Sequence, residues 1–186
     1  MQIHQKVLYL LLSSLTVSAA FAGNFKIDKD KSELAATMHA SPPHGFTSVA
    51  KNYVYDIEID PETLSVNKAV CSFKFADLDS GKNSRDKKMC KWMNVEKYPK
   101  AAFEMKSQLP DNASNEHVAR GSFTMHGVER PITIAYTLKR EGGQIILDGH
   151  CQFDHKDWGL EQVRLLFFAV DTLLKPHFHL VGTLEQ

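Results

Sequence analysis

Apolar side chains recur at every second position along much of this chain, and this alternation limits its possible folds more than any other feature. Between residues 53 and 60, two tyrosines and two isoleucines alternate with mostly polar residues. The same alternation returns in segments 71–75, 101–106, 132–138 and 145–153. Successive side chains of a strand point to opposite faces, so each segment is expected to form a strand with one apolar face. This pattern predicts an all-β protein built on an antiparallel sheet.

The connections between these segments are typical of hairpins. Glu141-Gly142-Gly143 separates two alternating segments, and 126–131, which starts with His126-Gly127, separates two others. His126 is therefore interpreted as a structural turn residue. About eight strands fit into the chain, and closing them into a barrel leaves no exposed edge. A two-sheet sandwich has the same periodicity, so the alternation alone leaves both architectures open.

A polar stretch over 79–91 interrupts the strand pattern. Its composition favours a loop leading into a short helix, which ends before Tyr98-Pro99 because the residue before proline disfavours the α region. Arg85 and Asp86 stand near the start of this helix. Such a pair can bond to backbone groups or to each other, so a structural role is expected for it.

The first 22 residues have the pattern of a cleaved signal peptide. Lys6 precedes an apolar run over 7–15, and Ala20-Phe21-Ala22 provides a small-x-small cleavage site. The run is too short for a spanning helix, although a retained N-terminal anchor is the alternative. We therefore expect a single exported domain over residues 23–186, located in the periplasm or secreted, with no stable membrane span.

Export changes the interpretation of the cysteines. Cys71, Cys90 and Cys151 would meet an oxidising compartment, where disulfides persist. Three cysteines allow at most one internal bridge, and the sequence does not select among the three pairs.

The charge composition argues against nucleic-acid binding. The chain has 22 basic and 22 acidic residues, so there is no basic excess to neutralise phosphates. Hydrophobic residues make up 43%, which is enough for a folded core. The sequence lacks a GxSxG motif, a matched Ser/His/Asp set and a glycine-rich phosphate loop, so no enzymatic activity is expected.

Several segments, in this order, resemble the YceI-like, polyisoprenoid-binding family. NSRDKKM at 83–89 followed by NVEKYP at 94–99 is similar to its RD…VEKYP segment. AFEMKS at 102–107 resembles the strand that follows, and GSFTMHGVERPI at 121–132 is close to its GDLTIHGVTKPV hairpin. Asp157-Trp158-Gly159 falls where the family has an Asp-Phe-Gly-type step.

The resemblance implies an extended eight-stranded antiparallel barrel of lipocalin-like shape, with a short helix near residues 83–93. It also implies a lumen that holds a long isoprenoid or related amphiphile. The segment 39–46 departs from the family pattern, and its residues Pro42 and Pro43 are expected to bar regular ladder pairing there. Homodimerisation through an exposed edge or loop is a further possibility that the sequence leaves open.

A binding barrel would turn its apolar side chains toward the lumen. Enclosing about ten carbons at ~0.8 kcal/mol each offers roughly 8 kcal/mol before ordering costs, enough for a micromolar site. The alternative is that the same side chains pack against one another in a filled core. The candidate lumen residues are Phe73, Phe75, Phe103, Met105, Phe123, Ile134, Tyr136, Leu147 and Phe153.

We therefore expect a non-enzymatic carrier for a long-chain apolar ligand such as a polyisoprenoid, a quinone or a fatty-acyl compound, with no cofactor. The alternative is an exported metal- or haem-binding protein. His177 and His179 share one face of a strand, and Cys151 or Cys71 would complete the ligand set. An enzyme acting on a bound lipid is a third hypothesis, without a nucleophile–base pair to support it.

Overall fold

The structure is a computed structural model that describes residues 22–40, 44–111, 116–165 and 168–185. The predicted signal peptide therefore lies outside the described residues, apart from Ala22. The described chain is mostly β-structure with one short α-helix, as predicted. No helix among these residues has the length and apolar character needed to cross a membrane.

Fourteen strands and one α-helix form the described chain, with three short 3-10 helices between them. The strands are β1 (Gly23–Ile27), β2 (Glu33–Ala40), β3 (His44–Ala50), β4 (Tyr53–Asp60), β5 (Ser65–Lys74), β6 (Leu78–Asp79), β7 (Lys100–Asp111), β8 (Glu116–Met125), β9 (Val128–Glu141), β10 (Gln144–His150), β11 (Phe153–Asp154), β12 (Arg164–Leu165), β13 (Phe168–Ala169) and β14 (Leu173–Glu185). The helices are η1 (Lys29–Lys31), η2 (Phe75–Asp77), α1 (Asn83–Trp92) and η3 (His155–Trp158).

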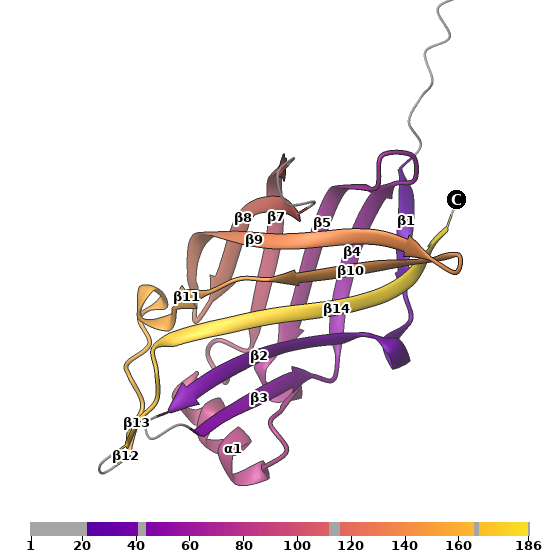
Figure 1. The fold of residues 1–186 in the computed structure, drawn as a ribbon. Helices are drawn as coiled ribbons and strands as arrows, with labels where there is room; N and C mark the ends of the chain where they lie inside the picture. The colour runs from indigo at the N-terminus through magenta and orange to yellow at the C-terminus, as the bar shows by residue number, and fades with distance from the viewer. Residues whose placement is uncertain (1–21, 41–43, 112–115, 166–167, 186) are drawn as a thin grey trace, which may run out of the picture.

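Eight of these strands close into an antiparallel barrel (Figure 1). Their order is β1-β4-β5-β7-β8-β9-β10-β14, and β14 pairs with β1 to complete the ring. Closure pairs Asn24 with Glu185 and Ile27 with Gly182. The barrel predicted from the family resemblance is confirmed, and the sandwich is excluded because the ladder returns to its first strand.

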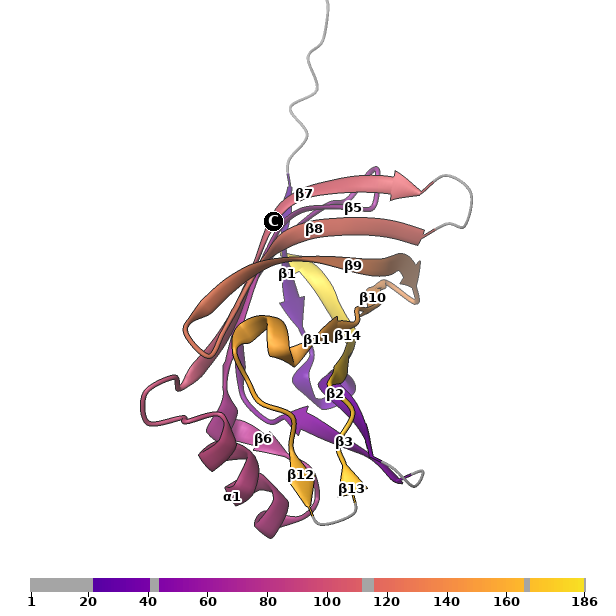
Figure 2. The same cartoon turned by 90° about the vertical axis from the view of Figure 1, so that its left-hand side faces the viewer.

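Strand β14 is long enough to pair with two different strands along one edge. Its C-terminal part pairs with β1, and its N-terminal part pairs with β2, which continues the sheet into β3 and β6 (Figure 2). The chain turns from β1 to β2 through η1, where the Ser32 hydroxyl accepts a hydrogen bond from the backbone N–H of Val181 at 2.9 Å. The barrel wall is thereby extended at one end by a three-stranded flap.

The alternating segments all form inward and outward faces, but two positions differ from the predicted strands. Phe75 lies in η2 rather than at the end of β5, and the predicted strand 145–153 stops at His150 before Phe153 begins β11. Pro42 and Pro43 were expected to bar regular ladder pairing over 39–46, and this prediction is wrong for the described residues of the segment. β2 and β3 pair regularly from Met38↔Phe46 to Ala40↔His44, while Pro42 and Pro43 lie outside the described residues.

The predicted helix over 83–93 is confirmed as α1. Arg85 and Asp86 both contact Ser80 in the turn before it. The Arg85 Nε–H donates to the Ser80 hydroxyl at 2.8 Å, and the Asp86 carboxylate accepts from the Ser80 backbone N–H at 3.2 Å. Arg85 also lies over the Phe46 ring at 4.2 Å, which ties α1 to β3. The structural role predicted for this pair is confirmed.

Two predicted hairpin turns have the backbone that such short connections require. His126 and Gly127 have φ angles of 51° and 74°, and Gly142 and Gly143 have 55° and 81°. Positive φ at both central residues is typical of the type I′ turn, whose twist matches the flanking strands. The ring of His126 also packs on Tyr98 at 4.4 Å, so its structural role is confirmed.

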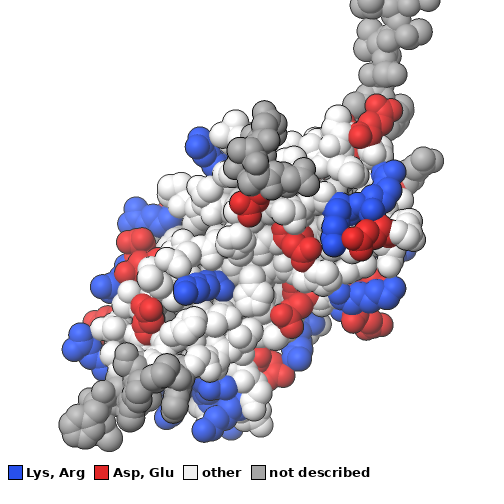
Figure 3. Space-filling model, in the orientation of Figure 1, with Lys and Arg blue, Asp and Glu red and all other residues white. Residues whose placement is uncertain are grey.

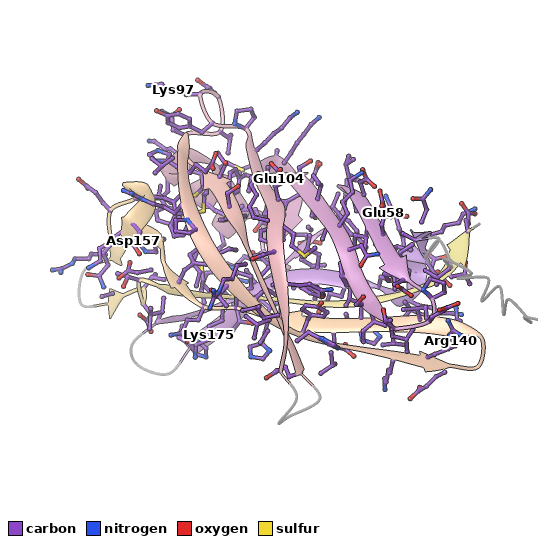
Figure 4. The ribbon with its side chains drawn as sticks, turned by 90° about the horizontal axis from the view of Figure 1, so that it is seen from above. Glu58, Lys97, Glu104, Arg140, Asp157 and Lys175 are labelled. Atoms are coloured by element: carbon purple, nitrogen blue, oxygen red, sulfur yellow. The ribbon has the colours of Figure 1, made fainter. Side chains whose placement is uncertain are left out.

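Charged side chains cover the outside of the barrel. On the face seen in Figure 3, basic and acidic groups are interspersed rather than gathered into a patch of one sign. The charged residues labelled in Figure 4, among them Glu58, Glu104 and Arg140, come from strands and turns around the whole barrel. The apolar faces of the same strands are therefore left for the interior.

Candidate functional site

A cavity lies in the interior of the barrel. Its volume is about 200 Å³, and its lining includes side chains from all eight barrel strands as well as β2, β3 and α1. This volume is below the roughly 300–1,000 Å³ of pockets for drug-sized ligands. Because residues from so many strands surround a small volume, the space between them is narrow. A flexible hydrocarbon chain fits such a space better than a bulky ring system.

All nine residues predicted for the lumen line this cavity. Phe103 is paired with Cys71 on one side and Phe123 on the other, so the inward faces of β5, β7 and β8 form a continuous apolar wall. Their contact with a ligand stays a prediction. The nine are Phe73, Phe75, Phe103, Met105, Phe123, Ile134, Tyr136, Leu147 and Phe153.

Several lining residues were missed at the sequence level. Helix α1 contributes Met89 and Trp92, and Met93 follows it directly. Their spacing of three and four residues is the signal that marks one face of a helix. Strand β14 contributes Pro176 and Phe178, whose alternation with the histidines of that strand also predicts an inward face.

Two glycines allow aromatic rings to lie flat against the wall. A Cβ atom on Gly149 would come within 2.3 Å of the Phe178 ring, and one on Gly121 within 2.5 Å of the Phe103 ring. Glycine inside a strand often marks such a close approach. Because each ring occupies the space of an absent side chain, it takes up less of the cavity.

One end of the barrel is filled by side chains. Phe25, Ile59 and Ile145 are almost completely buried there, and they do not line the cavity. At the other end, the Trp92 indole N–H donates to the Glu161 carbonyl at 2.9 Å, and its ring packs on His155 at 4.9 Å. Helix α1 is therefore tied to the segment after η3 beside the cavity.

The cavity lining among the described residues contains no aspartate, glutamate, lysine or arginine side chain. Two of its tyrosines have partners, since the Tyr55 hydroxyl accepts from the Ile27 N–H at 3.0 Å and the Tyr136 hydroxyl donates to Gln108 at 2.5 Å. Ser48 and Tyr53 differ, because their buried hydroxyls have no hydrogen-bond partner within the described part of the chain. The described lining is thus mostly apolar, and His150 is its one basic side chain.

Two of the cavity-lining side chains are thiols. Cys71 and Cys151, like Cys90 on α1, are free cysteines, so none of the three bridges that the sequence left open is present. Burial raises the pKa of Cys71 to about 11 and that of Cys151 to about 12. Both therefore remain protonated and weakly nucleophilic near neutral pH.

The predicted metal site is not assembled. His177 and His179 share the outer face of β14, where His177 lies 3.8 Å from Glu33 and His179 is hydrogen-bonded to Asp148. Cys151 and Cys71 instead line the interior cavity, away from the outer face that carries the two histidines. Among the described residues, no three histidine, cysteine or acidic side chains form a group suited to a metal ion.

Comparison with known sequences finds a family profile and several relatives that match this chain. The profile of the family described as YceI-like domain matches residues 25–181. A UPF0312 protein of Photorhabdus laumondii is 28% identical over 138 residues, which cover 69% of this chain and 68% of that protein. A UPF0312 protein of an Enterobacter species is 25% identical over 183 residues, covering 92% and 90%.

Solved structures share the fold. BcnA of Burkholderia cenocepacia superposes with a TM-score of 0.75 at 20% identity, covering 85% of this chain and all of that one. A polyisoprenoid-binding domain from Saccharophagus degradans, described as implicated in plant cell wall breakdown, gives a TM-score of 0.64 at 14% identity. That comparison covers 89% of this chain and 100% of the domain.

Proposed function

This chain belongs to the YceI-like domain family, and on that basis we propose that it is a carrier for a long-chain apolar ligand. The proposed ligand is a polyisoprenoid, a quinone or a fatty-acyl compound. The observation that carries the proposal is the interior cavity, which is lined by apolar side chains from every barrel strand and by no acidic, lysine or arginine side chain among the described residues. Support also comes from the shared fold with a polyisoprenoid-binding domain.

The physical argument is one of burial. Each methylene transferred from water into such a cavity contributes ~0.8 kcal/mol, and an extended chain can contact all the surrounding strands at once. The small volume limits how many conformations a bound chain can adopt, so an extended, chain-like ligand is preferred to a compact fused-ring one. No catalytic step is part of the proposal.

We also propose that the carrier acts outside the cytoplasm, in the periplasm or as a secreted protein. The signal-peptide pattern of residues 1–22 supports this location. Measuring the N-terminus of the protein isolated from its own cells tests it. A mature chain starting at Gly23 is expected, and a full-length chain retained in the cytoplasm would contradict export.

Native mass spectrometry of the protein purified without detergent from its native compartment tests the carrier function. The expected spectrum contains an adduct that organic extraction releases as a long-chain lipid. After delipidation, an added polyisoprenoid should restore the adduct. A protein that carries no extractable lipid and binds none added back would overturn the proposal.

A pair of matched variants assigns the lipid to the cavity. Ala69→Phe introduces a ring into the lining, whereas Val54→Phe introduces the same ring on the outside, where Val54 is 73% exposed. The lining variant should lose most of the bound lipid, and the outer variant should keep it. Equal lipid content in the two variants would place the ligand elsewhere on the protein.

A further inference from the structure

Two buried hydroxyl groups in the cavity wall make no hydrogen bond to the described part of the chain. Ser48 is 1% exposed and Tyr53 is 8% exposed, and both line the cavity. Neither hydroxyl oxygen has a hydrogen-bond partner among the residues that the structure describes. Leaving a buried polar group unpaired is unfavourable, so such groups are rare in folded proteins and call for an explanation.

Both hydroxyls belong to residues that are close together in the chain. Ser48 is near the end of β3 and Tyr53 begins β4, with Ala50 between them also in the lining. Across the ladder, Tyr53 is paired with Phe73, and the next inward pair is Tyr55 with Cys71. Burial, followed by the neighbouring Cys71 thiol and Tyr55 phenol, raises the pKa of Tyr53. The Tyr53 hydroxyl is therefore a neutral hydrogen-bond donor.

We propose that the Ser48 and Tyr53 hydroxyls form a polar subsite that binds an uncharged oxygen atom of the ligand, such as a carbonyl, ether or alcohol. This inference rests on the proposed carrier function and narrows its ligand class. The two hydroxyls supply hydrogen-bond donors in a wall that is mostly apolar, whereas the Tyr55 and Tyr136 hydroxyls of the same wall already have partners. A ligand with an acceptor at the matching depth satisfies both groups, and a pure hydrocarbon leaves both unpaired.

The same geometry disfavours a charged group at this depth. Placing a carboxylate or a phosphate in an apolar cavity without a permanent cation is very costly, and no lysine or arginine side chain is part of the described lining. The exposed Lys29 lies beside this wall, with its Nζ 5.3 Å from the centroid of the Tyr53 ring. Lys29 contacts the ring and is not among the lining residues.

Competition binding with three isoprenoid probes tests the subsite. Delipidated protein is loaded with a fluorescent apolar reporter, which is displaced by farnesylacetone (a ketone), squalene (a hydrocarbon) or farnesoic acid (a carboxylic acid). The test compares the wild type with Ser48→Ala, Tyr53→Phe and the double variant. The ketone should lose about fivefold in affinity per hydroxyl removed, while squalene binds the variants at least as tightly as the wild type.

Two variants outside the cavity serve as controls. Thr47→Ala removes an exposed hydroxyl beside Ser48, and Tyr98→Phe removes a phenol that does not line the cavity. Both should keep the wild-type ratio of ketone to hydrocarbon affinity. Because the two hydroxyls have no hydrogen-bond partner in the described part of the fold, Ser48→Ala and Tyr53→Phe should not lower the melting temperature.

The outcomes separate this inference from the carrier function. If all three probes bind but the double variant leaves their affinity ratios unchanged, the subsite is overturned while the carrier function stands. A farnesoic acid affinity above that of the ketone would also overturn it. If no probe binds at all, the carrier function fails, and the subsite fails with it.

Discussion

Cys71 and Cys151 are thiols in an apolar cavity, and their environment determines how they react. Their pKa values of about 11 and about 12 come from burial. At about pH 8 their thiolate fractions are on the order of a hundredfold or more below that of an ordinary cysteine. A cysteine in this state is chemically inert even in an oxidising compartment.

Alkylation with iodoacetamide, followed by peptide mass spectrometry, checks this expectation. Cys71 and Cys151 should be modified on the order of a hundredfold more slowly than the same cysteines in the urea-unfolded chain. Bound lipid should slow them further. Labelling of either thiol at the unfolded rate would show that the cavity is open to water.

His155 gives the protein a defined acid sensitivity. It is 1% exposed, its Nδ1 lies 3.3 Å from the Leu160 carbonyl, and burial lowers its pKa below 6.5. The unfolded chain takes up a proton near pH 6.5 that the folded chain excludes. The stability contributed by neutral His155 is therefore fully present above pH 6.5 and is lost as pH falls through the lower, folded-state pKa.

Urea unfolding at about pH 7.5 and about pH 5 measures this effect. The wild type should lose free energy of unfolding over that range, and His155→Gln should lose less. Asp60, whose pKa is lowered by backbone N–H groups of Thr63 and Glu62, acts in a lower window, below pH 3.8. An identical pH response in wild type and variant would contradict the assignment to His155.

At the scale of the strands, Gly149 in β10 leaves room for the Phe178 ring of β14, so that the ring takes up less of the cavity. These residues are register partners, and the ring lies where a side chain at position 149 would stand. In Gly149→Ala the ring must move, so we expect a loss of about 1–3 kcal/mol in the free energy of unfolding and weaker lipid binding.

Gly45→Ala on β3 is the matched control. Its Cβ would meet its nearest neighbour at 3.5 Å, an ordinary contact, so chemical denaturation should show an effect near zero or a slight stabilisation. Adding Phe178→Leu to Gly149→Ala should recover part of the lost lipid affinity. Equal stability of the two alanine variants would mean that the Phe178 ring does not depend on the glycine.

Trp92 is one of the contacts that hold helix α1 beside the cavity. Trp92→Phe removes the indole N–H that donates to the Glu161 carbonyl and keeps an aromatic ring in the lining. The loss of about 1 kcal/mol should loosen this end and raise the dissociation rate of a bound lipid about fivefold in stopped-flow transfer to vesicles. Lys91→Ala, an exposed neighbour on α1, should leave the rate unchanged. Unaltered release from Trp92→Phe would show that this end is not the exit.

For the molecule as a whole, ligand binding in the cavity is linked to the stability of the barrel that encloses it. A ligand that binds only the closed barrel stabilises it by about 2.7 kcal/mol at a concentration one hundred times its Kd. Thermal unfolding of delipidated protein should therefore move to higher temperature when polyisoprenoid is added. Lipid binding seen by native mass spectrometry without such a shift would place the ligand outside the folded interior.

The amino-acid sequence by itself determined which side chains face inward. Because side chains alternate strictly along a strand, the period-two pattern was sufficient to select Phe103, Ile134 and Leu147, and the turn residues were sufficient to place the hairpins. The family motifs then implied the closed barrel and the position of α1. These features depend on neighbours that are close in the sequence, so a local pattern can reveal them.

The tertiary structure decided what the inward faces form together. Sequence periodicity does not show whether they meet in a filled core or leave a cavity, since that depends on barrel closure through β1 and β14 and on glycines beneath aromatic rings. It also separated His177 from Cys151 and placed the Ser48 and Tyr53 hydroxyls in the cavity lining, where neither has a hydrogen-bond partner among the described residues. These arrangements join residues far apart in the chain, and the physical reason for them is the register of a closed sheet.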